Sequence, residues 1–162
     1  MKNNFKLYVA ALFLTFGAYA QQPSQENPQL YQSGGIYYRD KAQKNPYTGD
    51  YREYYDNGTI KLEMQIGNGV PEGTYVIYFE NRKPQEIRSY RGGKLHGLWR
   101  TYDISGQLIS EAEYRTGEKH GTWRIWDELG TQRYEMNYYN GKKTGTWRMW
   151  NEKGELIDEK RY

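Results

Sequence analysis

The sequence contains no cysteine among its 162 residues. This absence excludes disulfide bonds, thiolate metal sites and a lipid anchor on an N-terminal cysteine. Proline is also scarce, at five residues, so the chain is not a Pro-rich linker protein. Beyond the first twenty residues there is no long apolar run, and no second membrane segment is expected. Stability must therefore come from packing and backbone hydrogen bonds.

An excess of charge of one sign is missing as well. Lys and Arg total 23, and Asp and Glu total 20. Two of the lysines, Lys2 and Lys6, lie in a predicted signal peptide, and without them the balance is 21 to 20. A mature chain this close to neutrality lacks the basic field that attracts nucleic acid or acidic lipid. A nucleic-acid partner is therefore not expected.

Residues 1–20 have the features of a secretory signal peptide. Lys2 and Lys6 precede an apolar stretch of about ten residues, and Ala-Tyr-Ala at 18–20 fits the small-x-small cleavage rule. A membrane-spanning helix needs roughly 20 apolar residues, which favours a cleaved signal peptide over an anchor. The mature protein is expected to lack a transmembrane segment and to be exported, either to the periplasm or out of the cell.

Aromatic residues and glycine are abundant, with 18 Tyr, 5 Trp and 18 Gly, and they recur at a period of 24 residues. The leading glycines of the repeats are Gly49, Gly73, Gly97, Gly121 and Gly145. Four full repeats therefore begin at 49, 73, 97 and 121, and a final half-repeat spans 145–162. Residues 34–48 form a degenerate half-repeat with a strand near 36–42, and residues 21–33 form a flexible lead-in.

Each repeat holds two runs of strand length separated by turns, several with Asn-Gly at the tip. No segment after residue 20 has the 3.6-residue apolar period of a helix. The predicted fold is all-β, an elongated antiparallel sheet of stacked β-hairpins. If Tyr55 opposes Ile60, every hairpin places an Arg opposite a Glu, except one with two apolar residues. These pairs are Arg52–Glu63, Val76–Ile87, Arg100–Glu111, Arg124–Glu135 and Arg148–Glu159.

Period-2 alternation then assigns the two faces of the sheet. The face predicted to be buried carries Trp123, Ile125, Tyr134, Met136 and Tyr138. The opposite face carries Arg124, Trp126, Arg133, Glu135 and Asn137. On this polar face one aromatic column stands out, and with three arginines it forms the candidate interaction surface. Its members are Tyr54, Tyr78, Tyr102, Trp126 and Trp150, with Arg100, Arg124 and Arg148. The rings either stack on sugars or grip a peptide, or they pack along the sheet against their own neighbours.

Catalytic, cofactor and metal sites are not predicted. His96 and His120 share a column, but successive repeats lie about 9 to 10 Å apart, too far to share one zinc ion. Glu111, Glu135 and Glu159 form an acidic column whose spacing borders that of glycosidase carboxylates. Each of them has a predicted Arg partner, whereas acid–base catalysis needs two carboxylates in different environments. The serines lack both an elbow motif and a local His base.

The pattern Gly-x-Trp-x-x-Trp/Tyr, with a later Tyr-x-x-Gly-Lys-x-x-Gly, resembles MORN-type repeats. The best matches are residues 114–126 (YRTGEKHGTWRIW) and 138–150 (YYNGKKTGTWRMW). The chain is most similar to the bacterial variant subset that carries an antitoxin label. The resemblance implies an elongated, curled antiparallel sheet that serves in scaffolding, dimerisation or targeting. The antitoxin label implies little here, because a signal peptide would export the chain away from a cytoplasmic toxin.

These observations predict an exported, non-enzymatic scaffold that binds a protein at the cell envelope. A carbohydrate-binding surface module is the alternative, and an antitoxin-like protein or a hydrolase is disfavoured. The last strand, near residues 157–162, ends the stack with an open edge. Such an edge permits an edge-to-edge homodimer.

Overall fold

A computed structural model describes residues 28–162, which contain twelve β-strands and no helix. The predicted signal peptide and most of the predicted lead-in lie outside these residues. No helix that could cross a bilayer occurs in residues 28–162. The strands are β1 (Tyr31–Ser33), β2 (Ile36–Tyr38), β3 (Gly49–Tyr54), β4 (Ile60–Gly67), β5 (Val70–Tyr78), β6 (Pro84–Arg91), β7 (Lys94–Tyr102), β8 (Leu108–Arg115), β9 (Glu118–Trp126), β10 (Gln132–Tyr139), β11 (Lys142–Trp150) and β12 (Leu156–Arg161).

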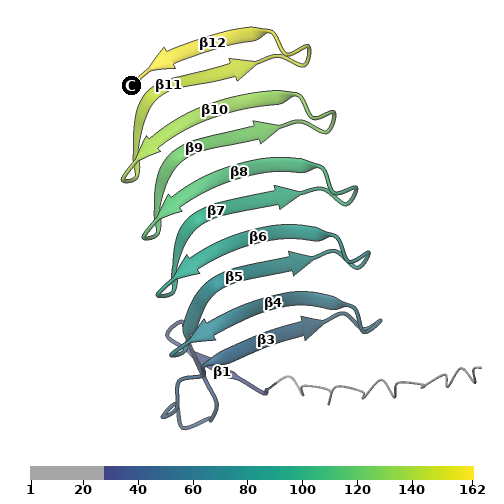
Figure 1. Ribbon diagram of the computed structural model, residues 1–162, viewed down its shortest axis with the longest axis vertical. Helices are drawn as coiled ribbons and strands as arrows, with labels where there is room; N and C mark the ends of the chain where they lie inside the picture. Colours follow the sequence, from purple (N-terminus) through teal and green to yellow (C-terminus); the bar gives the residue numbers. More distant parts are fainter. Residues whose placement is uncertain (1–27) are drawn as a thin grey trace, which may run out of the picture.

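Strands β3 to β12 form one antiparallel sheet in which each strand pairs with its neighbours in the chain (Figure 1). The order runs without crossover from β3 at one edge to β12 at the other. Successive hairpins stack along the long axis of the molecule, so that the sequence and the sheet run in the same direction. The prediction of an all-β, elongated sheet of stacked hairpins is confirmed.

Each 24-residue repeat has a turn at either end of its hairpin and a bend within its odd-numbered strand, and glycines with positive φ occupy most of these places. At the tip between β4 and β5, the N–H of Gly69 donates to the carbonyl of Tyr47 at 2.7 Å. The equivalent N–H of Gly141 donates to Lys119, so each tip is tied to the preceding repeat. At the bend, Gly121 has a φ of 61°, and a Cβ there would overlap the carboxylate of Glu113. Glycine is therefore required where the odd-numbered strands turn sharply (Figure 1).

The predicted register is confirmed for all five pairs, from Arg52↔Glu63 to Arg148↔Glu159. The pair from which it was extended, Tyr55 with Ile60, is wrong. A bulge between Glu53 and Tyr54 shifts the register, so that Tyr54 lies opposite Ile60. The Tyr55 N–H instead closes the turn on the carbonyl of Thr59 at 2.9 Å. The bulge recurs next to the same turn in later hairpins, which bends each strand before its tip.

Residues 34–48 do not add a strand to the large sheet, in contrast to the predicted half-repeat. The strand spans only Ile36–Tyr38, and it pairs with β1 in a separate two-stranded sheet. It ends early because the Asp40 carboxylate accepts hydrogen bonds from the N–H of Lys44 and Asn45, which favours a turn. We call residues 30–47 the capping segment, since Tyr47 and its neighbours pack on the first repeat.

The capping segment creates the best-buried region of the molecule. Leu62, Met64 and Ile66 on β4 are 9, 4 and 2% exposed beneath it. We call the face that carries these residues and Trp123 face A, and the face that carries Arg124 face B. Face A was predicted to be the buried side of the sheet, which is wrong for most of the residues named. Of the five residues named for it, only Tyr138 is buried, and Tyr134 is 40% exposed. Outside the capping segment the sheet is a single layer, so side chains bury one another sideways.

Candidate interaction surfaces

Face A carries a continuous ladder of aromatic rings from β7 to the C-terminus. Neighbouring ring centroids lie 4.9 to 5.8 Å apart and the rings are tilted toward each other. The order is Trp99, Tyr114, Trp123, Tyr138, Trp147 and Tyr162. The indole N–H of Trp123 donates to the Glu113 carbonyl at 3.0 Å, and the Lys119 ammonium covers its ring at 4.3 Å. These rings hold adjacent strands together, and all of them except Tyr162, which is 45% exposed, are partly or fully buried.

Face B carries a parallel ladder of ion pairs. Arg100 contacts Glu111 at 2.7 Å, and Glu111 also lies 3.7 Å from Arg124. Arg124 continues to Glu135 at 3.2 Å, and Glu135 lies at the same distance from Arg148. Arg148 ends the series on Glu159 at 2.8 Å. The three arginines predicted as part of an interaction surface are thus engaged by glutamates of the same sheet.

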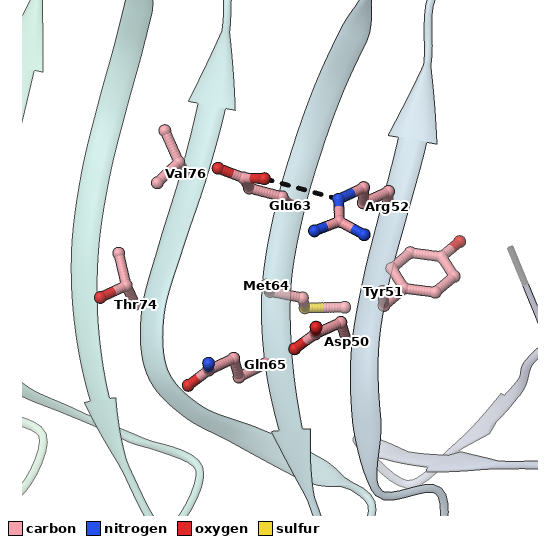
Figure 2. A pocket seen from close by; sticks show the side chains of 8 residues that line it. All are labelled: Asp50, Tyr51, Arg52, Glu63, Met64, Gln65, Thr74 and Val76. Atoms are coloured by element: carbon pink, nitrogen blue, oxygen red, sulfur yellow. Dashed lines mark ion pairs between the residues drawn. The ribbon is translucent and has the colours of Figure 1, made fainter. Parts of the chain in front are cut away.

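The ladder does not reach the N-terminal repeat, because Val76 and Ile87 replace an Arg and a Glu. Figure 2 shows Val76 beside the Arg52–Glu63 pair, which are 3.6 Å apart. They line a shallow groove of about 230 Å³. Glu63 lies opposite Val76 where later repeats have an arginine, and it accepts a hydrogen bond from the hydroxyl of Tyr78 instead. Burial and this hydrogen bond raise the pKa of Tyr78 to about 12.

The five predicted column residues lie on face B, one on each odd-numbered strand from β3 to β11. Tyr54 is 49% exposed, whereas the other four are half-buried. Tyr78 is committed to Glu63. Tyr78 also lines a groove of about 300 Å³, and Trp126 lines a larger one of about 500 Å³. The column is therefore not a uniform exposed surface.

The groove at Trp126 has a volume of about 500 Å³ and lies next to the hairpin tip between β9 and β10. Its apolar wall consists of Trp126, Ile109 and Leu129, and Leu129 is 87% exposed. Its polar wall is mostly acidic and consists of Asp103, Asp127, Glu128, Glu152 and the single cation Arg133. Arg133 lies 3.5 Å from Asp127 and donates to the Trp150 carbonyl, which leaves the rim acidic.

Ile109 and Leu129 were not identified from the sequence. Leu129 occupies a tip position at which the other repeats have polar residues. Those residues are Asn57, Asn81, Ser105 and Lys153. This exception to the repeat was the signal that could have found the groove.

The two aspartates of the rim, Asp103 and Asp127, have pKa values below the ordinary value of an aspartate. Hydrogen bonds from the Ser105 hydroxyl and the Gln107 N–H hold the pKa of Asp103 below its ordinary value. Burial raises the pKa of Asp127, but the N–H groups of Thr131 and Leu129 outweigh it and the pKa is lowered. Asp103 and Asp127 are therefore ionised at physiological pH.

The other sequence candidates are placed as follows. Glu111, Glu135 and Glu159 have the predicted arginine partners. His96 accepts the Thr116 N–H at 3.4 Å, and the His120 ring lies 5.3 Å from that of Tyr139. Across residues 28–162, no group of three or more His, Cys, Asp or Glu side chains is arranged to hold a metal ion.

Comparison with known proteins gives one family. The model described as MORN repeat variant matches residues 47–68 and 95–115. A search of curated proteins found no match. MORN repeats are generally modules that interact with proteins or membranes, and their all-β fold is generally non-catalytic. The predicted resemblance to MORN repeats is confirmed for these two segments, which fall on the first and third full repeats of the chain.

Proposed function

We propose that the protein is an exported, non-enzymatic repeat scaffold that binds a protein partner at the cell envelope through the groove at Trp126. The observation that carries the proposal is the groove itself. An uncovered apolar wall, with Leu129 87% exposed, faces an acidic rim. Contiguous apolar surface of this kind is typical of interaction sites. Export is supported by the signal-peptide features of residues 1–20.

The chemistry of the groove favours a particular kind of partner. An apolar side chain between Trp126 and Leu129 would be desolvated, and basic residues beside it would meet Asp103, Asp127 and Glu152. The acidic rim repels nucleic acid and anionic lipid. A protein segment with an apolar anchor flanked by lysine or arginine therefore fits best.

A glycan is the second candidate, and the observation that favours it is the recurrence of Trp126 and Trp150 on adjacent odd-numbered strands. Such rings, about 9 to 10 Å apart by strand spacing, could stack on successive sugar units. Sugar stacking requires the indole faces but not the acidic rim. The two candidates thus differ in their dependence on charge.

The test is capture of partners from the native envelope by the mature chain. We expect Trp126→Ala and Leu129→Ser to lose the partner that the wild-type chain retains. Tyr139→Ser is the matched control, because Tyr139 is 60% exposed but lies at the tip between β10 and β11, at the other ends of the strands. Glycan-array binding that is lost with Trp126→Ala and Trp150→Ala but kept at high salt would favour the glycan. A protein partner that both groove variants retain would contradict the proposal.

Export and processing are tested on the same sample. We expect the protein to fractionate with the envelope or the medium, and its N-terminus to be Gln21 by mass spectrometry. An intact Met1 in a cytoplasmic fraction would contradict the localisation.

A further inference from the structure

The two ends of the sheet are finished differently. At the β3 end the capping segment covers face A of the first repeat, where Ile66 is 2% exposed. At the other end, β12 is the last strand, and all six of its residues are exposed. Its outward backbone groups have no strand beside them in the described part of the chain. Within residues 28–162 the two ends therefore differ, because face A is covered at the β3 end and no segment covers β12.

The ion-pair ladder of face B ends at this edge with a glutamate that has one arginine neighbour, where the glutamates before it have two. Glu111 and Glu135 each lie between arginines of two neighbouring strands, and their side chains are 19% exposed. Glu159 contacts one arginine, Arg148, and its side chain is 49% exposed. Only its Oε2 oxygen has an arginine partner.

The aromatic ladder of face A ends at the same edge with a ring that has one ring neighbour, where the four rings before it have two. Tyr114 lies between Trp99 and Trp123. Tyr162 has one ring neighbour, Trp147, at 4.9 Å, and remains 45% exposed although the ammonium groups of Lys143 and Lys160 lie 4.9 and 5.1 Å from its ring centroid. The two ladders thus end with unfilled positions on opposite faces of one strand.

We propose that β12 accepts, by antiparallel pairing, a strand of a partner protein in which tryptophan or tyrosine is followed directly by arginine. The template is β11, where Trp147 precedes Arg148 and Arg148 lies opposite Glu135. In the same register the incoming arginine lies opposite Glu159 on face B. The incoming ring then lies beside Tyr162 on face A. Main-chain hydrogen bonds supply affinity, and the pair supplies selectivity.

This surface is separate from the groove at Trp126 and shares with the proposed function only the premise that a protein is bound. The distinction matters because a basic and aromatic strand also suits the chemistry of the groove. The experiment therefore includes variants of both surfaces.

A second copy of the chain fits this edge less well. Two-fold pairing of β12 with itself places one residue opposite its own copy. Centring on Asp158, Glu159, Lys160 or Arg161 opposes like charges, and centring on Ile157 opposes Glu155 to Glu159. Pairing with β3 of another copy, in the register of β4 with β5, places Arg52 opposite Glu159 but opposes Asp158 to Glu53. That arrangement also repeats head to tail without closing into a dimer. The homodimer predicted from the sequence uses the same edge and meets these repulsions.

The probe is a fluorescently labelled peptide with the sequence of residues 142–150, KKTGTWRMW, added to the full mature chain. We expect saturable binding by fluorescence anisotropy, with slowed hydrogen exchange at the amides of β12. Glu159→Arg should weaken binding at least tenfold. Leu129→Ser and Glu152→Arg, which alter the groove, should leave binding unchanged.

A charge swap separates the specific pair from general attraction. The peptide KKTGTWEMW should bind wild type poorly and should recover at least tenfold on the Glu159→Arg variant. Because Glu159 is exposed but lies opposite Arg148, this variant is expected to keep the wild-type circular dichroism and to melt slightly below wild type.

Three outcomes would overturn the proposal. They are the absence of saturable binding, binding that Glu159→Arg does not change, and binding lost with Leu129→Ser, which would place the peptide in the groove. Light scattering that shows a dimer of the chain, dissociated by Glu159→Arg, would identify the occupant of the edge as a second copy and would also overturn it. In each of these cases the proposed function would still stand if the groove variants, and not Glu159→Arg, lose the partner captured from the envelope.

Discussion

Arg82 adopts a backbone conformation that the other repeats give to glycine. Its φ is 67°, and its N–H donates to the Phe79 carbonyl at 2.9 Å, as Gly106 does to Asp103. The turn is therefore kept despite the side chain, at a cost of about 1–2 kcal/mol for a residue with a Cβ.

We predict that Arg82→Gly stabilises the protein by about 0.5–1 kcal/mol. Relief of the left-handed strain exceeds the backbone entropy that glycine loses on folding. Chemical denaturation measures the change. The matched control is Gly106→Arg, where φ is 93°, and it should destabilise by a similar amount. Equal stability of Arg82→Gly and wild type would show that the strain is compensated elsewhere.

Asp103 and Asp127 make folding sensitive to acid. Both carboxylates accept N–H bonds in their turns, and both pKa values are lowered on folding. A lowered pKa contributes stability above the unfolded value of about 3.9. That contribution is lost as the pH falls through the folded pKa.

The double variant Asp103→Asn/Asp127→Asn should therefore lose less stability than wild type between pH 5 and pH 2. The turns should survive, because Asn151 already accepts the N–H of Lys153 and Glu155 at the equivalent position. Denaturant midpoints measured across this pH range give the comparison. An identical pH dependence of the two proteins would refute the role of these carboxylates.

Single strands show why the two faces respond differently to substitution. On β9, Trp123 contacts the rings of Tyr114 and Tyr138 at 5.2 and 5.3 Å and donates a hydrogen bond. Three positions further on, Trp126 has none of these contacts among the described residues and lines the groove.

Trp123→Leu should destabilise the protein by about 2–3 kcal/mol, because ring contacts, a hydrogen bond and buried area are lost together. Trp126→Leu should cost less than about 1 kcal/mol. Thermal unfolding of the two variants provides the measurement. A loss of stability at Trp126 as large as at Trp123 would mean that the groove residue is structural.

Much of the strand architecture could be predicted because each repeat supplies an independent copy of the pattern. The joint change from Arg–Glu to Val76–Ile87 fixed the register. The bulge that moves Ile60 opposite Tyr54 could not be predicted, since period-2 alternation assumes an unbroken ladder. Burial was overestimated for the same kind of reason. Alternation indicates two faces but does not indicate whether another layer covers either of them.

The candidate site could be predicted in part. The column placed Trp126 on the polar face, where it lines the groove. Ile109 and Leu129 were missed because an alignment of repeats draws attention to what recurs, whereas this groove depends on what differs. The ion-pair ladder beyond each hairpin was missed because the register related two strands at a time.

At the scale of the whole molecule, each repeat contacts only its neighbours, so stability is close to a sum of repeat and interface contributions. The ends then decide where unfolding begins. The capping segment secures one end: Tyr47 is 5% exposed, and its hydroxyl donates to the Asp50 carbonyl at 2.7 Å. The other end has only β12, with its residues exposed.

We predict that hydrogen exchange is fastest at β12 and slows toward the first repeats, because opening propagates from the uncapped end. Tyr47→Ala should remove about 3 kcal/mol from the capped end and speed exchange in β3 and β4. Exchange in β11 and β12 should stay unchanged, since these strands share no contact with Tyr47. The matched comparison is Trp147→Leu, which should speed exchange only at the C-terminal end. Uniform acceleration along the whole sheet in either variant would mean that the protein unfolds as one cooperative unit, and the capping segment would then stabilise every repeat equally.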